Sequence, residues 1–332
     1  MLDLNNKSIL ITGGTGSFGR KFVEIVLQKF PNVKKLVVFS RDEHKQFEMA
    51  TKFSTEKYSC IRYVIGDVRD RLRLVRAFED IDIVIHAAAL KQVSAMEFNP
   101  MECINTNILG AENVIEAALN TSVRYVISLS TDKAVAPVSV YGASKLCSDK
   151  LFIAANEMRG TREIKFAVVR FGNVIGSRGS VVPYFLEQKE KGFLPITDEK
   201  MTRFGISCEE GAELIFHALE NCWGGELFVR KSASFKILDL AEAIAPGMPW
   251  KVVGLRPGEK IHEQMISESD SMNTFELEKY FVVLPVQTRN WMRTDWVNEF
   301  SGKSVDFGYR YDSISNTDWL SVNDLKERLQ GC

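Results

Sequence analysis

A glycine-rich turn near the amino terminus, Gly13-Gly-Thr-Gly-Ser-Phe-Gly19, constrains the fold more than any other stretch of this sequence. It follows a short apolar segment at residues 8–12 and precedes apolar residues at helical spacing. Strand, tight turn and helix together form a dinucleotide-binding fingerprint, here spaced Gly13-x-x-Gly16-x-x-Gly19. Glycines let the backbone approach a pyrophosphate, whose charge is met by amides of the helix N-terminus. We therefore predict dinucleotide contacts from the glycines and from Thr15, Ser17 and Phe18; the alternative is an ordinary loop.

The residues after the second predicted strand (35–39) bear on which dinucleotide binds. An NAD enzyme usually places an acid here for the ribose 2′-hydroxyl. This chain places Ser40 and Arg41 first, and Lys45 follows a turn later. Because these groups suit a 2′-phosphate, we predict NADP, with contacts from Ser40, Arg41, Asp42 and Lys45. The alternative is a capping box from Ser40 and Glu43 that opens a helix, with the basic groups simply solvated.

The next two predicted strands end in residues suited to the same cofactor. The strand at residues 60–67 ends in Asp67-Val68, where an adenine ring could sit. The strand at 81–90 ends in Ala87-Ala88-Ala89, whose small side chains would let a cofactor lie close, and Lys91 follows at the mouth. The strand–helix alternation predicts an α/β protein with a Rossmann-type doubly wound parallel sheet.

A constellation of ionisable side chains follows the fifth predicted strand, residues 123–129. Leu129 and Ser130 lead into Thr131-Asp132-Lys133, and Tyr141 is followed by Lys145. At this i, i+4 spacing a helix, predicted over 141–158, places the last two side chains on one face. A lysine near a tyrosine should lower the phenol pKa from about 10 and favour alcohol oxidation. Asp132 and Lys133 indicate a second proton-transfer step.

Length and composition limit the remaining possibilities. The 332 residues suit an NADP-binding domain over 1–173, a smaller α/β substrate lobe over 174–285 and an ordered tail over 286–332. With a net charge of −1 and no basic run, nucleic acid is an unsuitable partner. The six cysteines lack Cys-x-x-Cys spacing, and we predict no metal site. No long apolar run or signal peptide is evident, so we expect a cytoplasmic protein with no membrane partner.

These motifs carry a resemblance that covers nearly the whole chain. The glycine turn with Tyr141-x-x-x-Lys145 resembles the extended short-chain dehydrogenase/reductase superfamily. Within it, Asp132-Lys133 resembles the inverting nucleotide-sugar 4,6-dehydratases, whereas the retaining branch usually reads Thr-Asp-Glu. Further matching stretches are Ser40–Glu43, Ala88–Lys91, Asn173, Gly176–Pro183, Pro195–Thr197, Met201–Phe204 and Arg256–Lys260.

The resemblance implies a lyase that uses NADP and dehydrates UDP-N-acetylglucosamine, in the first step of pseudaminic acid biosynthesis, and that assembles as a homo-oligomer. Tyr141, assisted by Lys145, would deprotonate the 4-hydroxyl while NADP⁺ takes the hydride. Lys133 would remove the carbon-5 proton and Asp132 would protonate the leaving 6-hydroxyl, with Thr131 beside them. Hydride would return to carbon 6 with inversion at carbon 5. Burial beside the nicotinamide and Lys145 should lower the Lys133 pKa, with Asp132 opposing. The implied substrate contacts are Lys91, Thr131, Tyr141, Asn173, Val174, Arg178, Val181, Thr197, Met201, Arg203, Arg256 and Glu259.

Departures and rivals remain open at this point. Gln92 and Ser94 replace more usual residues, and Gly205 stands where an aromatic residue is common, so the sugar pocket could have altered walls. Arg256 suits the diphosphate, although a surface salt bridge with Glu259 is the alternative. The rival functions are a retaining 4,6-dehydratase, a UDP-hexose 4-epimerase, which needs no Asp132–Lys133 pair, and a non-enzymatic redox-sensing Rossmann protein.

Overall fold

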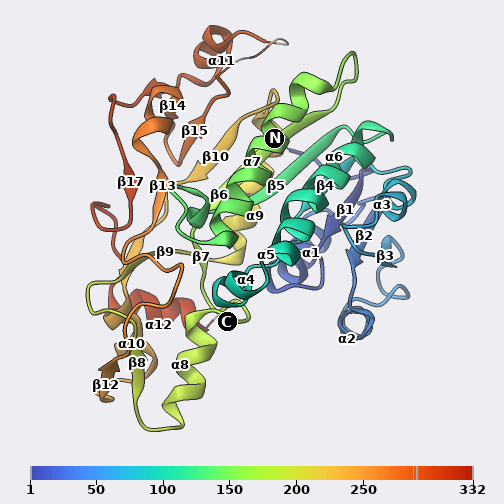
Figure 1. Ribbon diagram of the computed structural model, residues 1–332. Helices are drawn as coiled ribbons and strands as arrows, with labels where there is room; N and C mark the ends of the chain where they lie inside the picture. The colour runs from blue at the N-terminus through green and yellow to red at the C-terminus, as the bar shows by residue number, and fades with distance from the viewer. Residues whose placement is uncertain (1, 287, 289–290, 331–332) are drawn as a thin grey trace.

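A ten-stranded sheet forms the centre of the computed structural model, which describes residues 2–286, 288 and 291–330 (Figure 1). In spatial order it contains β16 (Lys303–Ser304), β14 (Thr274–Glu276), β15 (Tyr280–Val283), β10 (Leu227–Arg230), β6 (Lys165–Phe171), β5 (Tyr125–Thr131), β4 (Ile83–His86), β1 (Ser8–Thr12), β2 (Lys35–Ser40) and β3 (Ile61–Ile65). From β10 to β3 every pair of neighbours is parallel, whereas β15 and β14 add antiparallel pairs. The predicted doubly wound parallel sheet is confirmed.

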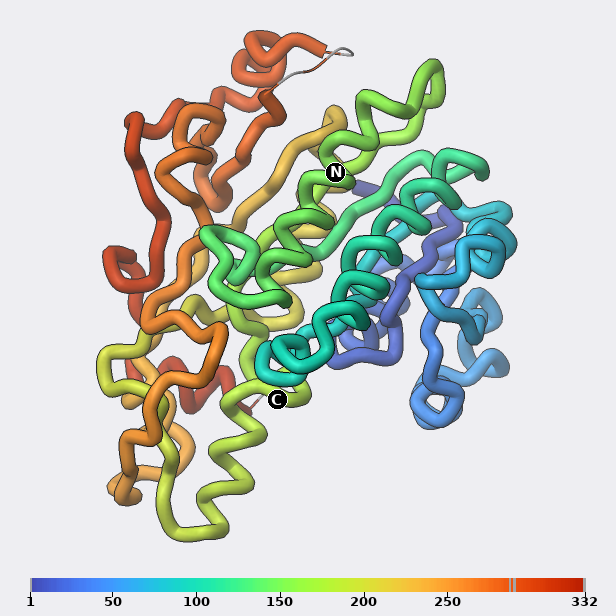
Figure 2. Tube along the Cα trace, in the orientation of Figure 1, coloured from blue at the N-terminus to red at the C-terminus, as the bar shows by residue number. Residues whose placement is uncertain are grey.

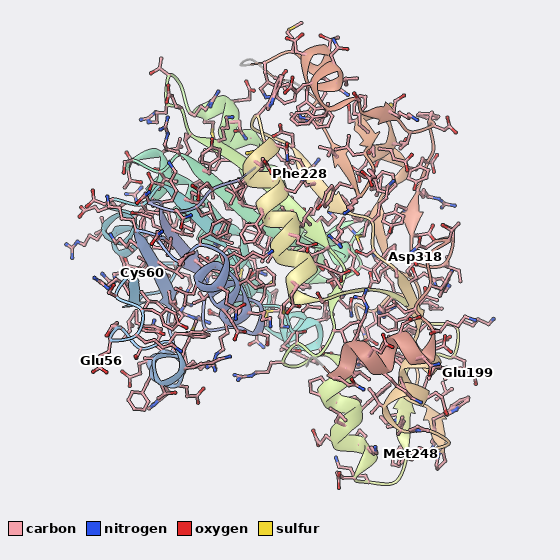
Figure 3. All side chains as sticks on the ribbon, turned by 180° about the vertical axis from the view of Figure 1, so that it is seen from behind. Glu56, Cys60, Glu199, Phe228, Met248 and Asp318 are labelled. Atoms are coloured by element: carbon pink, nitrogen blue, oxygen red, sulfur yellow. The ribbon has the colours of Figure 1, made fainter. Side chains whose placement is uncertain are left out.

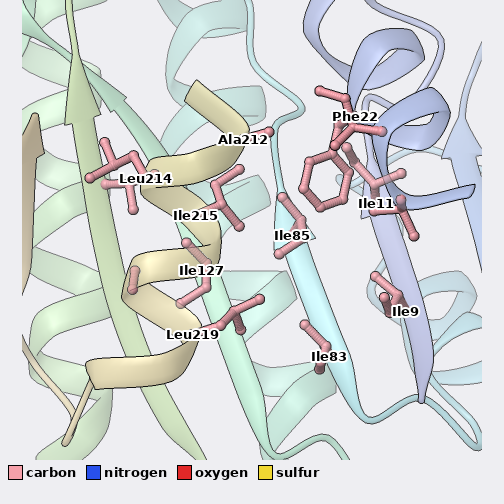
Figure 4. Packing of buried hydrophobic residues seen from close by; sticks show 14 of the residues in the cluster. Ile9, Ile11, Phe22, Ile83, Ile85, Ile127, Ala212, Leu214, Ile215 and Leu219 are labelled. Carbon is pink, nitrogen blue, oxygen red and sulfur yellow. The ribbon is translucent and has the colours of Figure 1, made fainter. Parts of the chain in front are cut away.

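Helices cover both faces of this sheet, which explains why its strands are nearly continuous apolar runs. One face packs against α1 (Ser17–Lys29) and α9 (Cys208–Asn221); Figure 4 shows Ile9 and Ile85 of the sheet near Phe22 and Ile215 of these helices. The opposite face packs against α3 (Arg71–Ala77), α6 (Gly110–Leu119) and α7 (Val140–Met158). A further helix, α2 (Glu43–Lys52), joins β2 to β3. The parallel strands therefore all end at one edge, between two helical layers.

The helical stretch between β4 and β5 is divided into four segments. It consists of α4 (Val93–Phe98), α5 (Pro100–Cys103), a π-helical segment (Ile104–Leu109) and α6. Pro100 explains the first break, because its ring nitrogen carries no proton to continue the preceding hydrogen bonds. The π-helical segment places Asn107 under the loop that follows β4, where it bonds both backbone groups of Leu90. Asn107 therefore has a structural role.

A smaller lobe lies at the carboxyl edge of the parallel strands, at the bottom of Figures 1 and 2. Its elements are β7 (Asn173–Val174), α8 (Val181–Lys189), β8 (Leu194–Ile196), β9 (Thr202–Ile206), β11 (Ser234–Lys236), α10 (Ile237–Ile244), β12 (Trp250–Val252) and α12 (Val322–Gln330). Their apolar side chains form a separate core around Phe235 and Leu240. Seen from behind in Figure 3, Glu199 and Met248 lie in this lobe, and Glu56 and Cys60 lie near the β3 edge of the main sheet.

Several late segments return to the main body. After β13 (Gln264–Ile266) and the 3₁₀ segment Glu268–Asn273, the strands β14 and β15 extend the large sheet, followed by α11 (Arg293–Phe300). In the tail, β17 (Tyr311–Asp312) pairs with β13, and α12 packs on α10. The domain boundaries at residues 173 and 285 stay predictions, and the tail's residues 287, 289–290 and 331–332, including Cys332, lie outside the described residues. None of the helices described is both long and apolar enough to span a bilayer.

Candidate active site

One large cleft, with a volume of about 1320 Å³, lies between the carboxyl ends of the parallel strands and the smaller lobe. It brings together nearly every residue predicted to bind cofactor or substrate, from the glycine turn to Arg256 and Glu259. Two predicted residues do not line it. Asp132 is fully buried behind the wall, and Asp67 turns toward neighbouring arginines. The gathering of residues far apart in sequence makes this cleft the candidate active site.

The glycine turn between β1 and α1 forms the floor at one end. Gly13 has φ +66°, and a Cβ there would lie 2.9 Å from the backbone of Ala88, so only glycine fits. Gly16 is the N-cap of α1 and supplies no side-chain hydrogen bond. The first amides of α1 therefore stay available for an anion. Across the turn, the backbone N–H of Arg178 donates to Ser17 Oγ at 3.0 Å, so the loop after β7 meets the glycine turn.

Arg41 and Lys45, the basic residues after β2, line the cleft but are already paired with acids. Asp42 caps α2 by accepting from the Lys45 amide at 3.0 Å, so the alternative Ser40–Glu43 capping box is wrong. The Lys45 ammonium also pairs with the Asp42 carboxylate and holds the pKa of that carboxyl below its ordinary value. Ser40 Oγ accepts from the buried Gln46 amide at 3.1 Å. A ribose in this part of the cleft would meet these residues, whose basic groups are already paired with carboxylates.

Asp67 and Val68, which follow β3, lie in different environments. Val68 lines the cleft and is buried. The Asp67 carboxylate is held by Arg69 at 2.8 Å and lies 3.5 Å from the Arg41 guanidinium. Its pKa is lowered, because bonds from Arg69 and the charge of Arg41 outweigh the effect of burial. Asp67 therefore supports Arg41 at the edge of the cleft and does not face the cavity.

Tyr141 and Lys145 reach the cleft because α7 begins directly against the turn after β5. Ser139 caps the helix by accepting from the Gly142 amide at 3.1 Å. A Cβ on Gly142 would lie 2.2 Å from the Lys133 carbonyl oxygen, so glycine permits this close approach. The 3₁₀ turn Asp132–Ala134 and the first turn of α7 thus pack as one unit. Tyr141, Lys133 and Lys145 therefore all line the cleft.

The tyrosine's electrostatics differ from the sequence-based expectation. Burial raises the pKa of Tyr141 to about 12, although the Lys133 charge acts in the opposite direction. Burial also lowers the pKa of Lys145, with Asp149 opposing the change. The expected lowering of the Tyr141 pKa by Lys145 is therefore wrong. Desolvation of the Tyr141 hydroxyl outweighs the charge of Lys133, because only 8% of Tyr141 is exposed.

Lys133 lies in a cluster of charges. Its ammonium donates to Asp132 Oδ1 at 2.9 Å and to Asn173 Oδ1 at 3.2 Å, and it lies 3.4 Å from Glu263 Oε1. Thr131 Oγ1 donates to the same Asp132 oxygen at 2.9 Å. Burial alone would lower the Lys133 pKa, but the Asp132 and Glu263 carboxylates reverse the effect and raise it. The expected lowering is thus wrong here, because the sequence did not reveal the second carboxylate.

The remaining predicted substrate residues line the cleft, and the guanidinium groups of Arg203 and Arg256 also contact other parts of the protein. Val174, Arg178, Val181, Thr197 and Met201 line the cleft from the smaller lobe. Arg203 also lines the cleft. Its guanidinium donates to the carbonyls of Thr202, Lys260 and Ile261, so this side chain has a structural role. Arg256 donates from Nε to Glu259 Oε1 at 2.9 Å, which is the alternative salt bridge. This pair lies at the cleft, and 62% of the Arg256 side chain is exposed.

Sequence reasoning missed some members of this site. Glu263 lines the cleft and closes the polar segment 255–263, of which only Arg256 and Glu259 were chosen. Asp149 lies one helical turn after Lys145 and accepts from Ser130 Oγ at 2.6 Å. The i, i+4 spacing from Lys145 could have found Asp149. Gln92 and Ser94 do line the cleft, whereas the inference about Gly205 is wrong, because its open side faces Ile175, Phe235 and Leu320 in the core of the smaller lobe.

Comparisons with known proteins agree with this architecture. The chain is 50% identical over 333 residues to a UDP-N-acetylglucosamine 4,6-dehydratase (inverting) of Campylobacter jejuni, covering 97% of each chain. It is also 41% identical over 331 residues to a UDP-glucose 4-epimerase of Rickettsia massiliae, covering 98% of this chain and 95% of the relative. The crystal structure of Pen from Bacillus thuringiensis superposes with a TM-score of 0.87 at 36% identity, covering 100% of this chain and 99% of the other. Residues 9–285 match the family described as polysaccharide biosynthesis protein, and the chain therefore belongs to this family, with the fold of the extended short-chain dehydrogenase/reductases.

Proposed function

We propose that this protein is an inverting nucleotide-sugar 4,6-dehydratase acting on UDP-N-acetylglucosamine, at the start of pseudaminic acid biosynthesis. The observation that carries the proposal is the contact between Lys133 Nζ and Asp132 Oδ1, 2.9 Å apart, beside the Tyr141–Lys145 helix. With a nicotinamide to accept the hydride, a tyrosine and a lysine suffice to oxidise an alcohol. Elimination of water additionally needs a base for a carbon acid and an acid for the leaving hydroxyl. The Campylobacter relative, 50% identical, bears the name of this activity.

The dinucleotide proposed here is NADP, which when bound accepts the hydride from carbon 4 and later supplies it to carbon 6. The fit is supported by the glycine turn, where a Cβ at Gly13 would meet the Ala88 backbone at 2.9 Å, and by the uncapped amides of α1. Arg41, directly after β2, and Lys45, in the first turn of α2, support a 2′-phosphate in preference to a hydroxyl. To bind the phosphate, Arg41 and Lys45 would exchange their contacts with Asp67 and Asp42 for contacts with its oxygens.

Tyr141 is the proposed base for the 4-hydroxyl. Its pKa of about 12 means that the phenol is protonated at neutral pH. A positive charge brought into the cleft favours the phenolate, and the charge of Lys133 already acts in this direction. Lys145, on the same face of α7, is positioned by its helix to share this wall. Oxidation of carbon 4 acidifies the neighbouring proton on carbon 5.

Lys133 and Asp132 then act as a pair. As an ion pair they contain an ammonium and a carboxylate, neither of which can perform its proposed step. Loss of a proton from Lys133 leaves a neutral amine, which can take the carbon-5 proton. The ammonium so formed can pass that proton along the 2.9 Å hydrogen bond to Asp132, which then protonates the departing 6-hydroxyl. Asn173, whose Oδ1 also accepts from Lys133 at 3.2 Å, keeps the lysine pointing toward the cleft.

A direct assay tests the proposal. Purified protein is incubated with UDP-N-acetylglucosamine in deuterium oxide, and the product is followed by proton NMR. We expect a 4-keto-6-deoxy sugar of L-arabino configuration, with deuterium at carbon 5. A D-xylo product formed from the outset would instead indicate a retaining enzyme.

A second function, 4-epimerisation of a UDP-hexose, is favoured by the relative of Rickettsia massiliae, which is named UDP-glucose 4-epimerase. An epimerase also uses the tyrosine and lysine but has no elimination step for Asp132 and Lys133. The same NMR experiment, repeated with UDP-glucose, distinguishes the two. UDP-galactose formed without loss of the 6-hydroxyl would favour epimerisation.

A further inference from the structure

Glu263 is a buried carboxylate at the back of the cleft. Only 2% of the residue is exposed, and Oε1 lies 3.4 Å from the Lys133 ammonium. Its other oxygen, Oε2, has no hydrogen-bond partner among the described residues and lies 4.0 Å from Lys260 Nζ. The residue immediately precedes β13, a strand that packs on the 3₁₀ turn carrying Lys133. A carboxylate so deeply buried is costly unless cations surround it.

We propose that Glu263 is a positioning residue that sets the protonation state of Lys133. This inference rests on the proposed function for its catalytic meaning, because only an elimination requires Lys133 to lose its proton. Glu263 touches neither the Tyr141 helix nor the glycine turn through any hydrogen bond or ion pair found among the described residues. Its effect should therefore fall mainly on the elimination, and the oxidation step should change only through the Lys133 charge that acts on Tyr141.

The charges facing Lys133 come from each element around it. Asp132 belongs to the same turn, Glu263 and Lys260 come from the segment before β13, and Arg203 comes from β9. Tyr141 of α7 and Lys91 of the loop after β4 also interact electrostatically with it. With Lys133 protonated, the two carboxylates face three close cations: Lys133, Arg203 and Lys260. With Lys133 neutral, two cations remain for two carboxylates, so the buried cluster stays balanced.

Removing the Glu263 charge changes this balance in one direction. Lys133 would keep Asp132 but lose its second carboxylate, while Arg203 and Lys260 would repel the ammonium. The neutral amine should then be populated at lower pH. The neighbouring cations keep their other partners: Arg203 donates to three backbone carbonyls, and Lys260 Nζ donates to the Val135 carbonyl at 2.6 Å. Glu263→Gln also preserves the volume and polarity of the side chain, so we expect it to fold.

The first measurement does not depend on any activity. Protein labelled with ¹³C at the lysine Cε is titrated by NMR, and the Lys133 signal is assigned by its loss in Lys133→Met. In Glu263→Gln we expect its midpoint to fall by about 1–3 pH units, the range for losing an opposite charge at this distance. The matched control is Glu210→Gln, which removes a carboxylate shared by Arg230 and Arg328 outside the cleft. The control should leave the Lys133 midpoint unchanged.

The second measurement connects the titration to the reaction. Dehydration of UDP-N-acetylglucosamine is followed against pH, alongside single-turnover oxidation. In Glu263→Gln the rise of dehydration with pH should move to lower pH by the same amount, while oxidation should stay within about tenfold of wild type, because Lys133 acts on Tyr141 only through its charge. If Glu263 had only a structural role, its replacement would lower the dehydration rate at every pH without shifting the pH dependence. That result would overturn the proposal. An unchanged Lys133 midpoint would overturn it whatever the activity. If the midpoint falls but wild-type protein dehydrates nothing, the proposed function fails and the Glu263–Lys133 coupling stands.

Discussion

The guanidinium of Arg41 lies 3.5 Å from the carboxylate of Asp67, so two residues predicted to bind different parts of one dinucleotide contact each other. Arg41 follows β2 and Asp67 follows β3, and neighbouring parallel strands bring both to the same edge of the sheet. Asp67 is also held by Arg69 at 2.8 Å. Asp67 thus orients Arg41, and Arg69 also balances the charge of Asp67. An incoming phosphate could replace Asp67 as the partner of Arg41 without leaving Asp67 unpaired.

Replacing Arg41 with alanine should weaken NADP binding specifically. A hydrogen bond to a charged group is worth about 1.5–3 kcal/mol, which corresponds to a loss of about 10–100-fold in NADP affinity. NAD affinity should change little, because NAD offers only a hydroxyl at this position. Titration of cofactor-free protein with each dinucleotide, read by tryptophan fluorescence, measures both constants. Arg69→Ala is the control, since Arg69 also pairs with Asp67 but does not line the cleft. Equal losses for both dinucleotides in Arg41→Ala would contradict the assignment of NADP.

Replacing Tyr141 with phenylalanine should stop oxidation while leaving the fold intact. The change removes one hydroxyl from a site that is 8% exposed. We expect single-turnover NADPH formation to fall by about 10²–10⁴-fold, the usual effect of losing a positioned acid–base group. Because the wild-type pKa is raised to about 12, the phenolate fraction grows as pH rises, and wild-type oxidation should accelerate with pH. The mutant should lose this acceleration. Oxidation at the wild-type rate in the mutant would show that another group is the base.

Replacing Asp149 with asparagine should destabilise the fold. Asp149 is 1% exposed, and its carboxylate lies 3.3 Å from the equally buried Arg170 guanidinium. Removing one member of a buried pair costs about 3–5 kcal/mol, and Arg170 would keep only the more distant carboxylate of Asp270, at 3.9 Å. The exposed pair of Arg124 and Glu163, 2.6 Å apart, is the comparison; Glu163→Gln should cost about 0–1 kcal/mol. Urea denaturation of both variants gives the two free energies of unfolding. Similar losses would mean that burial does not govern the Asp149 pair.

Local patterns predicted the parts of the site that depend on a single strand, turn or helix. The glycine turn was recognisable because strand, turn and helix are contiguous, and the face shared by Tyr141 and Lys145 follows from helical geometry. The parallel sheet followed from alternating apolar runs. Strand ends were misplaced by a few residues, since the hydrogen-bond ladder, unlike the apolar run, stops where the neighbouring strand stops.

Electrostatics was predicted poorly, because it depends on neighbours that are distant in sequence. Lys133 and Glu263 meet only when β13 packs on the turn after β5, and no local pattern encodes that contact. The Tyr141 pKa was placed on the wrong side of its ordinary value, because proximity to Lys145 was visible in the sequence and burial was not. Gly205 was linked to the sugar pocket because similar sequences commonly carry an aromatic residue at this position, yet β9 turns it toward the core of the smaller lobe.

Replacing Lys133 with methionine should separate oxidation from dehydration. Methionine has a similar length and no titratable group, so the cleft keeps its shape while losing the proposed base. Tyr141 remains, and we expect hydride transfer from carbon 4 to proceed within about tenfold of wild type, because Lys133 affects Tyr141 only through its charge. Elimination of water should fall by about 10²–10⁴-fold. NADPH absorbance should therefore rise in a single turnover and persist, instead of decaying as product forms.

The pH dependence of dehydration gives this experiment its second readout. Asp132 and Glu263 raise the Lys133 pKa, so the neutral amine is scarce at neutral pH, and wild-type dehydration should increase as pH rises toward that pKa. The residual dehydration of Lys133→Met should lack this increase. Lys231→Met serves as the control, because Lys231 pairs with Glu276 at 2.7 Å on the surface and does not line the cleft. If Lys133→Met dehydrates its substrate with the rate and pH profile of Lys231→Met, the base at carbon 5 is a different residue.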